Sequence, residues 1–123
     1  MTDESYIFDT YALIEIIRGN ENYKTYANAK IVITDFILAE LCFNLIRELG
    51  IAKSYYYVDE YAPFVYKIDK EVIKEAMHFR YLNKKKDLSM ADCIGHILAK
   101  RLGIKFLTGD KEFKSLENVE FVK

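Results

Sequence analysis

The chain has 123 residues, of which 51% are hydrophobic and 30% are charged, and its formal net charge is −1. This is the size of one ordinary domain, and the composition excludes an intrinsically disordered chain. The near-neutral charge excludes a strong overall field for nucleic acid, so any such contact requires a local basic patch.

The cysteines and the N-terminus give a first expectation about the cellular compartment. Cys42 and Cys93 lie in apolar helical patterns without a CxxC spacing, which predicts buried reduced thiols rather than a zinc site. The acidic start, residues 1–4, is unlike a signal peptide, and no apolar run is long enough to span a membrane. We therefore expect a cytoplasmic protein without a membrane partner.

Helical and strand patterns alternate along the chain. Helices are predicted from apolar residues at helical spacing, and strands from short runs that are apolar or rich in β-branched residues. In chain order the predicted elements are a strand at 6–8, helices at 11–18 and 21–28, a strand at 31–33, a helix from Thr34 or Asp35 to Leu49, a helix at 53–61, a strand at 64–68, helices at 70–82 and 89–102, a strand at 104–107, a helix at 112–116 and a strand at 119–122.

Capping and turn residues support these boundaries. Gly50 and Gly103 follow predicted helices, where a glycine commonly ends a helix, and Asp69 and Ser89 are suitable N-caps. No internal repeat or linker interrupts the pattern. The sequence therefore predicts an α/β fold in a single domain over residues 1–123, with a mostly parallel five-stranded sheet covered by helices on both faces as an α/β/α sandwich.

Four acids occupy positions that suggest a common site. Asp9 directly follows the first strand, Asp110 follows a later strand after a Thr-Gly turn, and Asp92 lies in the first turn of a helix. Glu40 interrupts the apolar stretch at residues 36–43, where a charge is costly unless it faces a site. Ligands bind beyond the carboxyl ends of parallel strands, so we expect the four acids to meet there.

Each acid also has an ordinary structural interpretation. Asp9 and Asp110 are suitable helix N-caps, Asp92 could complete a capping box with Ser89, and Glu40 could be a solvated helical charge. What favours a site is the joint placement of all four near one edge of one predicted sheet.

Gathered carboxylates repel one another and need a compensating charge. Mg²⁺ and Mn²⁺ prefer oxygen ligands and keep waters that a phosphodiester hydrolase can activate, with one or two metals at the site. The sequence therefore predicts a Mg²⁺ or Mn²⁺ cofactor, with Asp9, Glu40, Asp92 and Asp110 as catalytic and metal-binding residues.

Four segments that span nearly the whole chain resemble the PIN-domain ribonuclease family, in particular the VapC-like toxin branch of VapBC toxin–antitoxin pairs. They hold an Asp followed by Thr after the first strand, a Glu-bearing helix, an acid at a helix start, and a Thr two residues before the last Asp. The segments are residues 8–14, 38–41, 88–94 and 107–113. No single motif is specific, but four in order at this length are fairly specific.

The resemblance implies a flavodoxin-like fold and a Mg²⁺- or Mn²⁺-dependent endoribonuclease that hydrolyses RNA phosphodiesters. It also implies frequent homodimers and an antitoxin protein as partner. Tyr11 departs from the family pattern, in which a small or polar residue is commoner. That departure concerns access of the substrate rather than the four acids.

Several other residues have competing interpretations. Thr10 and Thr108 could support the acids or a bound water through hydrogen bonds, or could reflect strand-end propensity. Ser89 is a better helix cap than a catalytic group. His96 lies one turn after Asp92 and could be a ligand, although packing or a backbone hydrogen bond is the commoner role of such a histidine.

Basic and aromatic clusters could contact RNA or a partner. Lys84, Lys85 and Lys86 form the one basic run, in a loop that is otherwise expected to be solvated. Isolated basic candidates are Arg18, Lys100, Arg101 and Lys111. The tyrosines that could stack on bases, cover a partner or pack in the core are Tyr55, Tyr56, Tyr57 and Tyr61.

Three other functions compete with nuclease activity. An aspartate-based phosphatase usually has a second acid two residues after the first, a position that Tyr11 occupies here. A phospho-acceptor domain needs an acid pair and a strand-end lysine that the sequence does not offer convincingly. A catalytically weak or inactive RNA-binding module remains the alternative that only an activity assay separates.

Overall fold

The computed structural model describes residues 4–123, so Met1, Thr2 and Asp3 of the acidic N-terminus lie outside it. Four strands form one parallel sheet in the order β2-β1-β3-β4. The strands are β1 (Ser5–Phe8), β2 (Lys30–Val32), β3 (Lys105–Thr108) and β4 (Val119–Phe121). The predicted α/β class and parallel sheet are confirmed.

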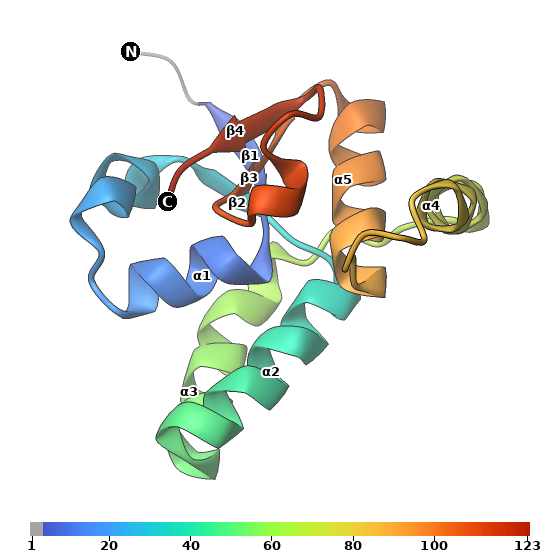
Figure 1. Ribbon diagram of the computed structural model, residues 1–123. Helices are drawn as coiled ribbons and strands as arrows, with labels where there is room; N and C mark the ends of the chain where they lie inside the picture. The colour runs from blue at the N-terminus through green and yellow to red at the C-terminus, as the bar shows by residue number, and fades with distance from the viewer. Residues whose placement is uncertain (1–3) are drawn as a thin grey trace.

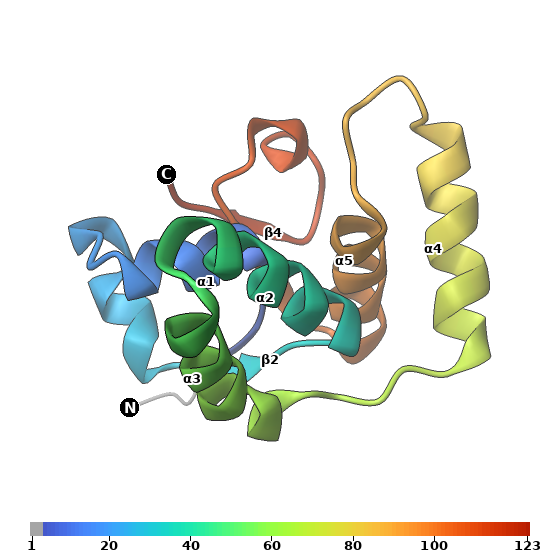
Figure 2. The ribbon, with the colours of Figure 1, turned by 90° about the horizontal axis from the view of Figure 1, so that it is seen from below.

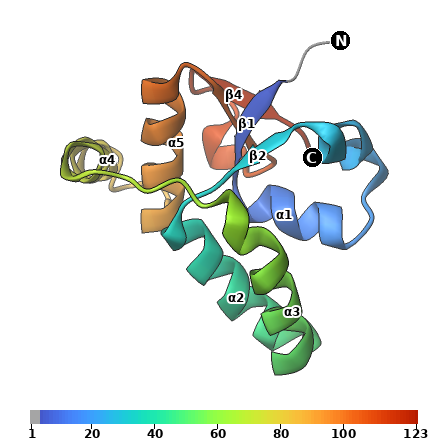
Figure 3. The same ribbon diagram turned by 180° about the vertical axis from the view of Figure 1, so that it is seen from behind.

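Helices surround this sheet on both sides. The α-helices are α1 (Thr10–Ile17), α2 (Asp35–Leu49), α3 (Ile51–Tyr61), α4 (Lys70–Leu82) and α5 (Met90–Leu102), and the 3-10 helices are η1 (Glu21–Asn28), η2 (Ala62–Phe64) and η3 (Lys111–Phe113). In Figures 1 and 3, α1 and η1 lie on one side of the strands and α5, backed by α4, lies on the other. The α2–α3 hairpin projects beyond the sheet end at which α1 begins.

The central strands and α5 hold the core. Ile7, Phe8, Phe106 and Leu107 on the two middle strands are fully buried. Every residue of α5 from position 91 to 99 is buried, because the helix lies between the sheet and α4. A helix buried on all sides cannot move without disturbing the sheet and α4, so α5 holds the side chains of its first turn in fixed positions.

Local signals in the sequence explain the helix ends. Thr34 Oγ1 accepts a hydrogen bond from the Ile37 amide at 3.1 Å, so Thr34 rather than Asp35 caps α2. Gly50, at φ 91°, ends α2 and turns the chain into α3. A left-handed φ of this kind favours glycine, so this turn depends on that residue.

The predicted fifth strand at residues 64–68 is wrong. Residues 62–64 form η2 instead, and Val65 makes a single parallel bridge with Ile33. The ladder cannot continue because the chain beyond Ile33 already turns into α2 at its cap, Thr34. The predicted helices at 21–28 and 112–116 are also altered: each is, at least in part, a short 3-10 helix.

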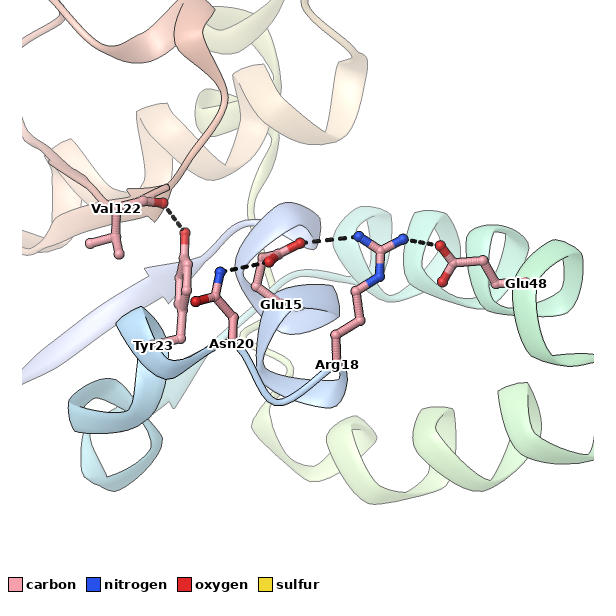
Figure 4. A network of polar contacts seen from close by, with 6 residues as sticks. All are labelled: Glu15, Arg18, Asn20, Tyr23, Glu48 and Val122. Carbon is pink, nitrogen blue, oxygen red and sulfur yellow. Dashed lines mark hydrogen bonds and ion pairs between the residues drawn. The ribbon is translucent and has the colours of Figure 1, made fainter.

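Polar contacts tie α1 and η1 to the rest of the fold (Figure 4). Arg18 forms ion pairs with Glu15 on its own helix and with Glu48 on α2. Tyr23 donates a hydrogen bond from its hydroxyl to the Val122 carbonyl beyond β4. Side-chain contacts therefore hold α1 and η1, which lie outside the hydrogen-bonded strands of the sheet.

Both cysteines are free thiols, with Cys93 buried and Cys42 half-buried. Ser54 on α3 is completely buried and donates a hydrogen bond to the Cys42 carbonyl at 2.9 Å, which fastens the α2–α3 hairpin. Among residues 4–123, no helix is long and apolar enough to cross a membrane.

Gly95 allows α5 to approach the sheet, and we predict that Gly95→Ala destabilises the protein. A Cβ at this position would lie 2.7 Å from Phe106 Cε1 and 3.2 Å from Ile37 Cδ1. Overpacking a core typically costs about 1–3 kcal/mol, whereas replacing a helical glycine by alanine gains at most about 1 kcal/mol. Denaturant unfolding should show a net loss of stability that does not exceed about 3 kcal/mol, and a raised stability would contradict the close approach.

Candidate metal centre

Asp9 is fixed at the carboxyl end of β1 by hydrogen bonds to both of its carboxylate oxygens. Oδ1 accepts from the Thr10 amide at 2.8 Å, and Oδ2 accepts from the Thr108 hydroxyl at 2.6 Å. The side chain is 2% exposed. Asp9 thus caps α1 as the structural interpretation predicts, yet one of its oxygens is held by a residue from β3.

Asp92 combines a cap with a place beside Asp9. Ser89 Oγ accepts from the Asp92 amide at 3.0 Å, and Asp92 Oδ2 accepts from the Ser89 amide at 3.0 Å, which completes a capping box. The residue is 7% exposed and sits in the first turn of the buried helix α5. The cap orients the carboxylate, so the two interpretations of Asp92 do not exclude each other.

Glu40 completes a compact group of carboxylates. It is half-buried on α2, and single carboxylate oxygens of Asp9, Glu40 and Asp92 all lie within 4.8 Å of one another. Three acids from three different elements, β1, α2 and α5, therefore converge at one point. The expected meeting of acids beyond the strand ends is found for these three.

Asp110 lies at the same site but outside the compact group. Its amide donates to the Thr108 hydroxyl at 3.0 Å, and its carboxylate accepts from the Glu112 amide at 3.0 Å, as a cap of η3. It lines an open cleft of about 540 Å³ together with the other three acids. Thr108 thus connects Asp9 and Asp110 through one hydroxyl group.

The electrostatics of this cleft favour a bound cation. Burial raises the pKa of Asp9 well above its ordinary value, and the charge of Asp92 raises it further against the opposing hydrogen bond from Thr108. Burial also raises the pKa of Asp92, opposed by the Ser89 backbone hydrogen bond and assisted by the charge of Glu40. The fold therefore concentrates negative charge that a divalent cation would neutralise.

The supporting residues separate into those at the cleft and those away from it. Thr10 Oγ1 is buried at the cleft and has no hydrogen-bond partner among residues 4–123. His96 does not line the cleft: its Nε2 donates to the Glu117 carbonyl at 3.0 Å, and its ring packs among phenylalanines. Burial lowers the pKa of His96, as expected for a packed neutral imidazole.

Tyr11, the departure from the family pattern, closes one wall of the cleft. Its ring lies against Gly109, where an added Cβ would clash with both that ring and the Val122 carbonyl. Glycine is therefore required between Thr108 and Asp110. The Tyr11 ring therefore packs against the turn that carries Asp110 and supports it.

Three polar residues that line the cleft were not identified from the sequence: Asn44, Arg80 and Asp87. Two of them had a detectable signal. Asn44 lies one turn after Glu40, and Arg80 continues the four-residue spacing of the buried positions Val72 and Ala76. Asp87 lies in a loop, where no periodicity applies.

The tyrosines of α3 divide between the surface and the core. Tyr55 and Tyr56 are 55% and 59% exposed, whereas Tyr57 and Tyr61 pack partly against the core. Core packing therefore accounts for two of the four.

Comparison with known proteins identifies a family over almost the whole chain. The model of the PIN domain family matches residues 6–119. No curated protein has a significantly similar sequence.

Solved structures share the fold at low sequence identity. The toxin VapC20 from Mycobacterium tuberculosis, described as cleaving the sarcin-ricin loop, has a TM-score of 0.79 at 14% identity, covering 96% of this chain and 99% of that one. A toxin–antitoxin complex from Klebsiella pneumoniae has a TM-score of 0.70 at 18% sequence identity, covering 94% of this chain and 95% of that one. DNA-bound VapBC from Salmonella typhimurium has a TM-score of 0.71 at 16% sequence identity, covering 96% of each chain. At these identities the likeness establishes the fold.

Asp92→Asn should raise the melting temperature in EDTA. The substitution removes one of three mutually repelling charges, and the asparagine oxygen can still accept from the Ser89 amide. Loss of a charge at a helix N-terminus opposes this gain by about 0.3–1 kcal/mol. Differential scanning fluorimetry with and without Mg²⁺ measures both effects, and the variant should gain less than wild type from Mg²⁺.

Asp35→Asn is the matched control, because Asp35 is an exposed acid in the first turn of α2. It should lower stability slightly and leave the response to Mg²⁺ unchanged. The folded pKa values of Asp9 and Asp92 are raised, so carboxylate repulsion weakens as pH falls through them. The advantage of Asp92→Asn over wild type should therefore shrink as the pH is lowered from neutrality. A variant that melts lower in EDTA and gains as much from Mg²⁺ as wild type would make Asp92 a cap alone.

Proposed function

This chain belongs to the PIN domain family, and we propose that it is a metal-dependent endoribonuclease that hydrolyses RNA phosphodiesters as the toxin of a VapBC-type pair. The observation that carries the proposal is the convergence of Asp9, Glu40 and Asp92, with single oxygens within 4.8 Å of one another. Asp110 lines the same open cleft.

The donor set fits Mg²⁺ or Mn²⁺. All four acids offer hard oxygen ligands, and no histidine or cysteine lines the cleft among the residues described. The unpartnered hydroxyl of Thr10 adds a further oxygen at the same place. We propose Asp9, Glu40, Asp92 and Asp110 as the residues that hold the ion, which when bound supplies charge neutralisation at the phosphate and activation of water.

Other side chains contribute to the reaction by holding these acids in place. Thr108 donates to Asp9 and accepts from the Asp110 amide, so it sets the relative position of the first and last acids. Ser89 fixes Asp92 through the capping box. These contacts preorganise the carboxylates before RNA binds, which is how a buried polar site avoids reorganisation during the reaction.

The composition of the cleft determines the expected product ends. Attack by the ribose 2′-hydroxyl needs a general base and acid, typically histidines, and His96 is bonded to the Glu117 carbonyl away from the cleft. Hydrolysis by water leaves a 5′-phosphate and a 3′-hydroxyl instead. The absence of a second acid two residues after Asp9 disfavours an aspartate-based phosphatase.

Incubation of RNA with the purified protein should give cleavage with Mg²⁺ or Mn²⁺ and none in EDTA. Asp9→Asn should abolish it, and Thr108→Val should lower the rate about 10–100-fold because it removes the hydrogen bond that orients Asp9. Asp59→Asn, an exposed acid on α3, is the control and should retain full activity. Products with 2′,3′-cyclic phosphate ends would refute the mechanism, and binding without cleavage would favour an inactive RNA-binding module.

An antitoxin partner and a homodimer are part of the same proposal. The Klebsiella and Salmonella neighbours are toxin–antitoxin complexes by description. The α2–α3 hairpin exposes large apolar side chains of the kind that partners cover, among them Phe43 at 62% and Ile51 at 58%. An inhibitory partner would place a basic side chain in the acidic cleft.

Light scattering at micromolar concentration should give twice the 14.4 kDa chain mass. Co-expression with the small basic protein of a neighbouring reading frame should yield a stable complex without nuclease activity. A monomeric mass would contradict the dimer, and nuclease activity that persists in the complex would contradict the inhibitory partner.

A further inference from the structure

A second cavity adjoins the acidic cleft. It has a volume of about 430 Å³ and is lined by residues from the end of α4 and from the loop to α5. Figure 2 shows the course of this helix and loop. Its lining residues are Met77, Arg80, Tyr81, Lys84, Lys86, Asp87 and Leu88. Because Arg80, Asp87 and Leu88 line both spaces, a ligand held at the carboxylates can extend directly into the second cavity.

The charge of this second cavity is opposite to that of the cleft. Arg80, Lys84 and Lys86 face one acid, Asp87, so three cations outnumber one anion. Within residues 4–123, none of these three cations has a carboxylate within ion-pair distance. Their charge is therefore available to an external anion.

Three of the four isolated basic candidates are already neutralised within the fold, and Lys111 is the one of the four without an ion pair among residues 4–123. Arg18 is paired with Glu15 and Glu48 (Figure 4). Ion pairs also engage Lys100 with Glu117, and Arg101 with Glu75. This difference separates the loop at residues 83–88 from cations that serve internal contacts.

An aromatic ring completes the second cavity. Tyr81 is 64% exposed, and the Lys84 ammonium lies 4.4 Å from the centroid of its ring. A cation over an exposed aromatic ring suits a nucleotide, because the phosphate can draw the ammonium while a base stacks on the ring. Single-stranded RNA has both groups free at neighbouring positions.

We propose that this basic cavity binds single-stranded RNA next to the bond to be cleaved, with Lys84 and Lys86 on backbone phosphates, Arg80 between the two cavities, and Tyr81 under a base. The inference rests on the nuclease function proposed above. It also answers an electrostatic difficulty, since a polyanion must approach a cleft lined by five acids in a protein of net charge −1. The adjacent cations supply the local attraction that the whole molecule lacks.

Fluorescence anisotropy with a short labelled single-stranded RNA in EDTA, where cleavage is blocked, tests the proposal over a series of KCl concentrations. The double variant Lys84→Gln, Lys86→Gln should bind more weakly, and its slope of log affinity against log salt should flatten by about 1.4, or about 0.7 for each phosphate that a lysine no longer neutralises. Tyr81→Leu should weaken binding at least about fivefold with the slope unchanged, because stacking is not a charge interaction.

The matched control is Lys67→Gln, Lys70→Gln, which removes the same charge from exposed lysines at the opposite end of α4. It should bind RNA with the wild-type slope. Equal losses in the two double variants, or no loss in either, would overturn the proposal. If wild type cleaves RNA and the Lys84, Lys86 variant keeps its affinity, the inference fails and the nuclease function stands. If wild type neither binds nor cleaves RNA, both fail.

Discussion

The site and the elements that hold it depend on one constraint, the mutual repulsion of buried carboxylates. Asp9 and Asp92 are almost fully buried, and Glu40 brings a third carboxylate within 4.8 Å. Burial and like charge both raise the pKa of Asp9. A fold that served only stability would have little reason to retain this arrangement. The metal binding proposed above would account for this repulsion, because a bound cation would neutralise the acids.

The fold maintains that arrangement by giving each acid a second, structural role. Asp9 caps α1, Asp92 completes the capping box of α5, and Asp110 caps η3. Each cap fixes one carboxylate oxygen with a backbone amide, and the Thr108 hydroxyl holds the second oxygen of Asp9. The helices are in turn held by the core, most firmly α5, which is buried on all sides. Rigid placement of the acids therefore follows from ordinary capping chemistry at the ends of parallel strands.

Much of this architecture could be predicted from the sequence, because its signals are local. Ser89 and Asp69 cap helices as their positions indicate, and Gly50 ends α2. Asp9 and Asp110 were identified because they follow strands, Asp92 because it lies in the first turn of a helix, and Glu40 because it interrupts an apolar helical pattern. The strand at residues 64–68 could not be corrected from the sequence, since its failure depends on where a distant strand, β2, stops pairing. Local propensity carries no information about the partner strand.

For the loop at residues 83–88, the sequence raised a contact with RNA but favoured a solvated loop. A basic run in a polar loop is usually solvated, and only the structure places Lys84 on the Tyr81 ring and both beside a cavity that joins the acidic cleft. His96 illustrates the converse: its helical spacing from Asp92 left a ligand role open, and the structure confirms the commoner role, a backbone hydrogen bond to the Glu117 carbonyl and packing against phenylalanine rings. Contacts between segments distant in the chain decide both cases.

A crystal structure of the protein soaked with Mn²⁺, with the anomalous signal of manganese used to locate the ion, tests the central claim most directly. We predict a manganese peak bound by carboxylate oxygens of Asp9, Glu40 and Asp92, the three that converge in the fold. Metal–oxygen distances should be close to about 2.1 Å, as for hard divalent cations bound by carboxylates. Manganese found only elsewhere, with these carboxylates unchanged and free of metal, would contradict it.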